Sequence, residues 1–424
     1  MSLENYRSTM MGCSKCSYCK FIPLAKVQSI KYSCGCPSVD FYGFHTYSGG
    51  GRLTAALSFL DGRSSYTEEV KNMVYQCQLC GNCDVTCKVC RYNMEVQGAL
   101  EEIRARLVED GQTLPVHDLA IENLRKENNM VMKPGAGRGD WAKGLGLKDL
   151  KNEQCDTMFF AGCRPSFDRD AQKTAMAAVR VLNHAGVNPG IMGDAEICCG
   201  SAAYNLGYRD DFLRQAAANI SALKKAGVKT IVTSCANCYW AFVRLYNRID
   251  GFDIEVMHTV QLAEKLIKEG KLRFTKEVPL KVTYHDPCRL GRLGEPHVPW
   301  DGEVTEVFNI IPKHTPPKPR YNGAWGIYDP PREILKAIPG LSLIEMERSR
   351  ESSWCCGAGA GVGAAFPDFN SKTVQDRIEE AEGTGADALA TACPLCGLNF
   401  TEAITEKGSG MKVYDVLELA EMAL

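Results

Sequence analysis

The sequence lacks the long apolar runs and the surplus of charge that would place a protein in a membrane or on a nucleic acid. No stretch of about 18 apolar residues occurs in its 424 residues, which argues against a membrane-spanning helix. The 49 Lys and Arg residues nearly balance the 51 Asp and Glu residues, so nucleic acid is not an expected partner. The amino terminus also lacks the apolar core and cleavage site of a signal peptide. We therefore expect a cytoplasmic protein without a direct membrane span, with peripheral attachment through a partner subunit left open.

Cysteine, by contrast, is abundant, with 21 residues in the chain. In a reducing cytosol, cysteines at regular short spacings indicate metal ligation rather than a disulfide framework, which is typical of small secreted domains. We therefore interpret the cysteines as candidate metal ligands.

Two sets of five cysteines repeat in the same order. Each set is a lone cysteine after a strand-like run, then Cys-Cys-Gly, then Cys-x-x-Cys. The sets are Cys163, Cys198, Cys199, Cys235 and Cys238, followed by Cys288, Cys355, Cys356, Cys393 and Cys396. Five thiols exceed the four ligands of a tetrahedral zinc, so each set indicates a multi-iron cluster. A structural zinc site is the simpler alternative, but it leaves one thiolate in each set unexplained.

The chain from about residue 154 onward reads as an internal duplication. Three blocks recur in order: 155–163 matches 280–288, 227–238 matches 385–396, and 253–266 matches 410–423. Each repeat alternates strand-like runs with amphipathic helices, such as 170–185 and 210–226, which predicts α/β lobes with short parallel sheets. Cys163, Cys235, Cys288 and Cys393 should then lie at the carboxyl ends of strands, where open α/β sheets usually hold ligands. From the pseudo-symmetry we extrapolate a face-to-face arrangement with a cleft between the two sets.

We divide the chain into an N-terminal domain (1–127), a glycine-rich linker (128–152), and two cysteine-rich lobes (153–275 and 276–424). The N-terminal domain should be mostly helical and ferredoxin-like. Its clearest helix spans 93–110, with Val96, Leu100, Ile103 and Leu107 on one side, Glu101, Glu102, Arg104 and Arg106 on the other, and Gly111 as the cap.

The N-terminal cysteines have the spacing of a two-cluster ferredoxin. Cys77, Cys80, Cys83 and Cys87 form one run, and Cys13, Cys16 and Cys19 begin another whose fourth member is displaced. In such runs the fourth thiol ligates the neighbouring cluster. We therefore assign one [4Fe-4S] cubane to Cys13, Cys16, Cys19 and Cys87, and a second to Cys77, Cys80, Cys83 and Cys36. The fourth ligands stay open, because Cys90 competes with Cys87 and Cys34 with Cys36.

Two other interpretations of these motifs are weaker. A thioredoxin-type site needs two thiols near a βαβ unit, not eight at ferredoxin intervals. The glycine run 357–363 follows cluster thiols and not a strand, so it is not a Rossmann fingerprint. With no flavin or nicotinamide site visible, we expect a partner protein to supply the electrons.

At this point the chain resembles the heterodisulfide reductase B/D subunit family, in a form that fuses the small ferredoxin subunit to the catalytic subunit. The segments that carry the resemblance are the two Cys-Cys-Gly repeats behind the ferredoxin-like domain, YHDPCRLGR (284–292), YDPPREILKAIPGLSLIEM (328–346) and WCCGAGAG (354–361). The resemblance implies a noncubane [4Fe-4S] cluster on each five-cysteine set, with a small disulfide substrate cleaved between them. It also implies an oxidoreductase subunit of anaerobic metabolism, with a flavoprotein, a ferredoxin-like protein or a membrane cytochrome as partner.

Candidate catalytic residues follow from these expectations. Cys199 and Cys356 are the second thiols of the Cys-Cys pairs. Arg289 and Arg292, just after Cys288, would stabilise a reduced cluster or an anionic substrate, and solvated arginines are the alternative. His285 would donate a proton to a leaving thiolate, and a structural histidine is equally compatible with the sequence.

A second function competes with disulfide reduction. Relatives that only relay electrons occur in other redox machines, including putative electron-donating modules of benzoyl-CoA reductase complexes. The lone cysteine and the Cys-Cys pair are separated by 34 residues in the first repeat and 66 in the second, and we place the surplus at 294–326. An insertion that roofs the space between the two sets would favour the relay, an open cleft would favour catalysis, and a surface excursion without a role is the third option.

Overall fold

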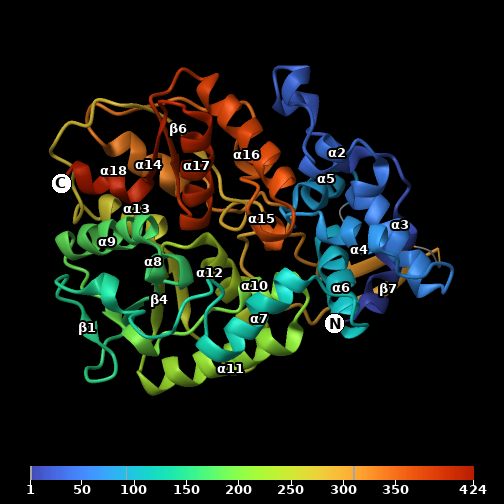
Figure 1. The fold of residues 1–424 in the computed structure, drawn as a ribbon, viewed down its shortest axis with the longest axis horizontal. Helices are drawn as coiled ribbons and strands as arrows, with labels where there is room; N and C mark the ends of the chain where they lie inside the picture. Colours follow the sequence, from blue (N-terminus) through green and yellow to red (C-terminus); the bar gives the residue numbers. More distant parts are fainter. Residues whose placement is uncertain (1, 92, 309–310) are drawn as a thin grey trace.

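A computed structural model describes residues 2–91, 93–308 and 311–424 of the chain. Figure 1 shows the N-terminal domain in blue, the first lobe in green and the second lobe in orange and red, packed into one molecule. The helices of the N-terminal domain are α1 (Arg7–Gly12), α2 (Pro37–Tyr42), α3 (Gly49–Leu60), α4 (Glu68–Tyr75), α5 (Asn82–Cys90), α6 (Val96–Glu109) and α7 (Pro115–Glu127). This domain is helical, as expected.

Helix α6 is the centre of the N-terminal domain, and it is buried on more sides than its sequence pattern indicated. Its apolar side packs into the domain core, with Leu100 and Leu107 buried. Its polar side is buried as well, because Glu101, Glu102 and Arg104 face the two lobes. A polar stripe is usually solvated, and here the docking of the three domains covers it.

The first lobe is a parallel sheet with strand order β1-β3-β2-β4-β5. Its strands are β1 (Lys148–Asp149), β2 (Thr157–Phe159), β3 (Gly190–Ile191), β4 (Thr230–Thr233) and β5 (Glu255–His258). Its helices are α8 (Cys163–Phe167), α9 (Arg169–His184), α10 (Ser201–Leu206), α11 (Arg209–Lys225), α12 (Ala236–Trp240) and α13 (Thr259–Lys268). The segment 128–152, which we expected to link two domains, contributes β1 to this sheet and buries Trp141.

The second lobe repeats this plan with the parallel order β9-β6-β10-β11. Its strands are β6 (Lys281–His285), β9 (Ser342–Leu343), β10 (Ala388–Thr391) and β11 (Lys412–Asp415). Its helices are α14 (Asp329–Ala337), α15 (Val362–Ala365), α16 (Pro367–Glu382), α17 (Pro394–Lys407) and α18 (Val416–Met422). Matching strands occupy matching positions in the two sheets, which confirms the predicted α/β class.

The two lobes share a hydrophobic core. Helices α9 and α13 of the first lobe pack against α14, α17 and α18 of the second (Figure 1). Val260 and Leu266 on α13 join Leu335 on α14 and Leu417 on α18 in one buried cluster. The amphipathic helices therefore bury their apolar faces against their counterparts in the other repeat.

The long insertion of the second repeat forms an antiparallel hairpin, β7 (Glu303–Val307) and β8 (Ile311–Thr315). Residues 309 and 310, which fall inside the predicted insertion, lie outside the described part of the chain. At the base of the insertion the main-chain N–H of His297 donates to Val243 and the carbonyl of Tyr321 accepts from Lys88. The insertion thus docks on the first lobe and the N-terminal domain, and Figure 1 draws β7 on that side of the molecule.

Candidate iron-sulfur sites

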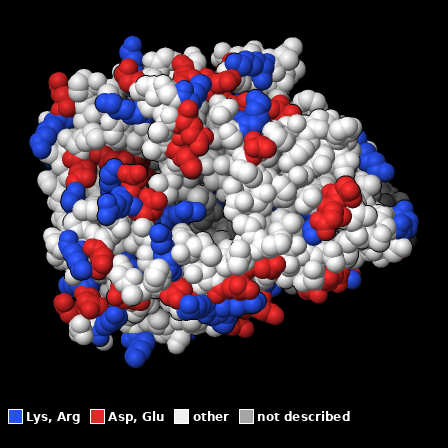
Figure 2. Space-filling view, viewed as in Figure 1, with Lys and Arg blue, Asp and Glu red and all other residues white. Residues whose placement is uncertain are grey.

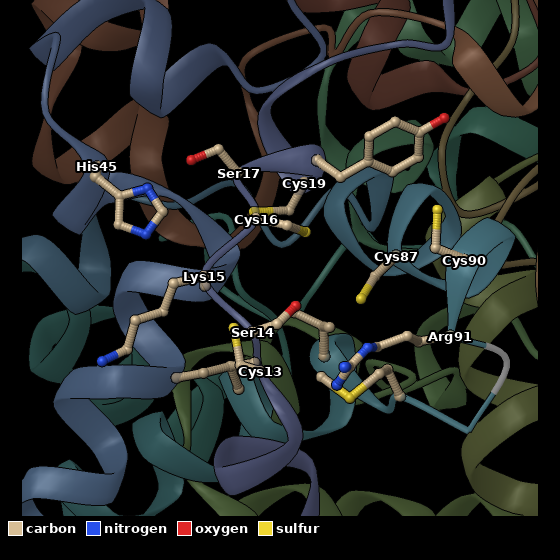
Figure 3. A pocket seen from close by; sticks show the side chains of 15 residues that line it. Cys13, Ser14, Lys15, Cys16, Ser17, Cys19, His45, Cys87, Cys90 and Arg91 are labelled. Atoms are coloured by element: carbon tan, nitrogen blue, oxygen red, sulfur yellow. The ribbon is translucent and has the colours of Figure 1, made fainter.

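The loop after α1 carries Cys13 and Cys16, and the short 3-10 helix Tyr18–Lys20 that follows carries Cys19. A cavity of about 260 Å³ is lined by the thiol-bearing residues Cys13, Cys16, Cys19, Cys87 and Cys90. In Figure 3 the Cys87 side chain points toward the loop cysteines, whereas the thiol of Cys90 is directed away from them. Cys16 and Cys90 are exposed, so this cavity opens at the protein surface.

A second cavity lies deeper, between α3, α5 and the start of α2. Its cysteines are Cys36, Cys77, Cys80 and Cys83. Cys34 is turned elsewhere, with its thiol 3.7 Å from the carbonyl oxygen of Lys20. The structure thus brings Cys87 and Cys90 to the cavity of Cys13, Cys16 and Cys19, and Cys36 to the cavity of Cys77, Cys80 and Cys83.

In the first lobe, Cys163 follows β2 and Cys235 follows β4, as expected for the carboxyl ends of strands. Neighbouring thiols shift one another's pKa in three pairs: Cys163 with Cys198, Cys198 with Cys199, and Cys199 with Cys238. The pKa of the Cys199 thiol is held well below its usual range, first by Cys198 and then by Cys238. A lowered pKa favours the thiolate, which is the form that ligates metals.

The second lobe places its cysteines in the same pattern. Cys288 follows β6, and Cys393 begins the turn into α17. Hydrogen bonds from Cys355 and then Cys396 lower the pKa of the Cys356 thiol to about 6. Cys199 and Cys356 are therefore equivalent in position, and in each the pKa is lowered first by the preceding cysteine.

His285 lies beside this second set. One of its ring nitrogens lies within 4.8 Å of the sulfur atoms of Cys356 and Cys396. Burial, and then the positive charge of Arg377, hold the pKa of His285 well below its usual range. Because the Arg377 guanidinium donates to Nδ1 at 3.2 Å, the ring is neutral with its proton on Nε2.

The two arginines after Cys288 are both buried, and both donate hydrogen bonds within the protein. Arg289 donates to Asn205 at 2.7 Å and lies 3.7 Å above the ring of Trp240. Arg292 donates to Asn82 and to the carbonyl of Glu351, each at 3.0 Å. Both side chains join the second lobe to its neighbours, so neither is a solvated surface arginine.

The cysteine groups approach one another at two places. The thiol of Cys80, in the deeper N-terminal cavity, lies close enough to that of Cys355 in the second lobe that Cys355 is the largest cause of the raised pKa of Cys80. The thiol of Cys393 in the second lobe lies close enough to that of Cys235 in the first that Cys235 is the largest cause of the lowered pKa of Cys393. The deeper cavity, the second lobe and the first lobe therefore form a series.

One face of the molecule is hollowed near its centre (Figure 2). Figure 2 shows a depression near the centre of the viewed face, between the positions of α12 and α17 in Figure 1, with basic side chains at its rim. Helix α12 begins just after Cys235 and α17 just after Cys393.

Three buried charged residues around the sites were missed at the sequence level. Arg104 donates to carbonyl groups of all three domains, and Arg138 and Glu196 form a buried ion pair beside Cys163. Lone charged residues in a helix or a glycine-rich segment resemble solvated ones. Nothing local in the sequence marks these three as buried.

The donor chemistry suits iron-sulfur groups. Every cysteine of the two N-terminal groups and the two lobes is a free thiol, and thiolates are the usual ligands of such clusters. Within the described ranges, no helix has the length and apolar character needed to span a bilayer.

Comparisons with known proteins agree with this chemistry. The family described as "Cysteine-rich domain" matches residues 157–243 and 318–401, one segment in each lobe. The D-type subunit of the dihydromethanophenazine:CoB–CoM heterodisulfide reductase of Methanosarcina mazei is 33% identical over 85% of this chain and 80% of its own length. A probable iron-sulfur-binding oxidoreductase of Bacillus subtilis is 30% identical over 88% of this chain and 50% of its own. An EtfAB:quinone oxidoreductase of Syntrophomonas wolfei is 30% identical over 81% of this chain and 46% of its own. The chain thus belongs to the family of iron-sulfur oxidoreductases that includes the D-type subunits of heterodisulfide reductase.

Proposed function

We propose that this chain carries electrons from its N-terminal domain to the paired lobes and reduces a small disulfide where the lobes meet. The series of contacts between cysteine groups, through Cys80 and Cys355 and then Cys393 and Cys235, is the observation that carries this proposal. Iron-sulfur clusters held by these thiolates would supply one-electron redox couples. Cleavage of one disulfide takes two electrons and two protons and yields two thiols.

The ligand assignment follows the cavities. We propose that Cys13, Cys16, Cys19 and Cys87 hold one cubane, and that Cys36, Cys77, Cys80 and Cys83 hold the other. Each five-cysteine set would hold a noncubane cluster. The side chain of Cys87 points into its group and that of Cys90 points away (Figure 3), and Cys34 is absent from the lining of the second cavity.

An electron-donating partner would dock on the N-terminal domain, because the first cavity opens there. The segment 21–44, which follows the loop cysteines of this cavity along the chain, exposes the large apolar side chains Phe21, Leu24, Ile30 and Phe44, with Ile30 85% exposed. Large exposed apolar side chains on one segment are typical of protein interaction surfaces. We infer a redox partner at this face, of the flavoprotein, ferredoxin-like or cytochrome class.

A relay that never binds a disulfide is the second candidate. It is favoured by the engagement of Arg289 with Asn205 and Trp240, and by the neutral state of His285. A neutral buried imidazole donates a hydrogen bond through Nε2 rather than serving as a strong acid. In the proposed disulfide reduction, His285 therefore orients a thiolate ligand, and the protons come from solvent.

Anaerobic spectroscopy separates the two candidates. Purified protein should contain four clusters' worth of iron and acid-labile sulfide, and oxidised protein should develop a new paramagnetic signal when a thiol is added. The signal should disappear in Cys199→Ser and Cys356→Ser and persist in Cys155→Ser, whose cysteine lies outside every group. If the wild-type protein shows no thiol-dependent signal, disulfide chemistry is refuted and the relay stands. If it contains zinc without sulfide, both candidates fail.

A further inference from the structure

A buried guanidinium contacts the cysteine set of the first lobe. Arg138, from the segment between α7 and β1, is 2% exposed. Its Nη2 lies 3.7 Å from the Sγ of Cys163 and 3.0 Å from a carboxylate oxygen of Glu196. Glu196 also accepts the main-chain N–H groups of Ala161 and Gly162, each at 2.9 Å. The guanidinium is thus held in place between a carboxylate and a proposed cluster ligand.

The second lobe is built differently at the equivalent places. Glu196 stands two residues before its Cys-Cys pair, and Ser353 stands at that position in the second lobe. The main-chain oxygen of Ser353 accepts from Arg292, and its hydroxyl accepts from Arg377. Arg289 follows Cys288 directly and donates to Asn205. Arg292, four residues after Cys288, donates to Asn82 and Glu351. In the first lobe a guanidinium thus donates a hydrogen bond to a ligand sulfur, whereas in the second lobe Arg289 and Arg292 act on Cys288 through their charge.

A hydrogen-bonded cation beside a ligand sulfur favours the reduced state of an iron-sulfur group, because reduction adds a negative charge. Hydrogen bonds to the sulfur atoms and the net charge around a cluster both change its reduction potential. The effect is strong in a buried site, where water screens charges weakly. Arg138 donates a hydrogen bond to the Cys163 sulfur, and it is buried.

We propose that Arg138 raises the reduction potential of the iron-sulfur group on the Cys163 set and so makes the first lobe the terminal electron acceptor of the chain. The inference rests on the proposed function. One electron leaves the group on the second lobe, which is oxidised, and enters the group on the first, which is reduced; no bond changes and no proton moves. The series of contacts agrees, because Cys355 meets the N-terminal domain whereas the first lobe is reached through Cys393 and Cys235.

Two opposite substitutions test the assignment. Arg138→Met removes the cation and leaves Glu196, so the potential of the first-lobe group should fall. Glu196→Gln keeps the cation and two of the hydrogen bonds, so the potential should rise. We expect a change of at least tenfold in the one-electron equilibrium in each direction, which is about 59 mV. The measurement is a potentiometric titration followed by EPR, on the signal that Cys163→Ser alters.

Two further variants serve as controls. Arg164→Met removes a positive charge one residue after Cys163, but from an exposed side chain, so the potential should stay within experimental error. Arg138→Lys keeps the charge and should retain most of the potential, even if Arg138→Met loses the cluster.

Shifts of Arg138→Met and Glu196→Gln in the same direction would mean a general structural effect and would overturn the inference. The inference also fails if both variants keep full iron content and titrate like Arg164→Met. Wild-type protein without iron and sulfide would instead refute the proposed function itself.

Discussion

Replacement of Arg104 should uncouple the N-terminal domain from the two lobes. Its guanidinium is fully buried and donates to the carbonyl of Asn205 in the first lobe at 3.0 Å and of Ala360 in the second lobe at 2.9 Å. It also donates to Val74, Tyr75 and Cys77 within the N-terminal domain. Burial lowers the pKa of Arg104 to about 10, so the group stays charged at neutral pH. A single cation therefore satisfies carbonyl groups of three domains.

The expected cost of Arg104→Met follows from those acceptors. Each buried carbonyl that loses its donor costs roughly 1–3 kcal/mol of stability. Part of this loss is offset, because the variant no longer has to bury a charge. We expect a net loss of about 3–5 kcal/mol in the free energy of unfolding. The matched control is Arg106→Met, two residues along the same helix, whose side chain is 40% exposed in a surface ion pair. That change should cost less than about 1 kcal/mol.

The assay combines stability with electron transfer. Anaerobic urea unfolding and amide hydrogen exchange at α6 and α10 measure the loss of docking. Stopped-flow reduction should show normal reduction of the N-terminal groups and slowed transfer to the lobes, with unchanged iron content. If Arg104→Met matches Arg106→Met in stability, exchange and transfer rate, Arg104 does not hold the domains together.

Three further changes test other parts of the structure. Gly207 has a φ of +104°, and a Cβ there would lie 2.4 Å from the carbonyl oxygen of Arg104. Gly207→Ala should therefore lower the free energy of unfolding by about 2 kcal/mol more than Gly186→Ala, because Gly186 has a positive φ but open space around it. Equal melting temperatures of the two variants would contradict this. Cys87→Ser should lower the iron content by about one cluster whereas Cys90→Ser should not, and the reverse result would move the fourth ligand to Cys90. Burial lowers the pKa of His117 from 6.5 to about 4, so the unfolded chain binds a proton that the folded chain does not, and stability falls as pH drops below 6.5. Between pH 7 and pH 5, the free energy of unfolding should fall by about 2 kcal/mol less in His117→Gln than in the wild-type protein. An equal fall in both proteins would show that His117 does not contribute.

The sequence by itself determined the ligand chemistry, the duplication and the class of fold. The spacing of the cysteines predicts which thiols share a short loop. The alternation of strand and helix patterns predicts α/β lobes. The helices expected at 170–185 and 210–226 occur as α9 and α11, within one residue at each end. These features depend on neighbours along the chain, which is why a single sequence reveals them.

Only the tertiary structure decided how the cysteine groups meet and which charges are buried. The contacts of Cys80 with Cys355 and of Cys235 with Cys393 join residues far apart in the chain, and they depend on how the three domains dock. Arg104 and Arg138 look like surface residues in their own segments, and they become buried because carbonyl and carboxylate partners arrive from other domains or distant turns. The burial of a charge depends on long-range partners that no local pattern encodes.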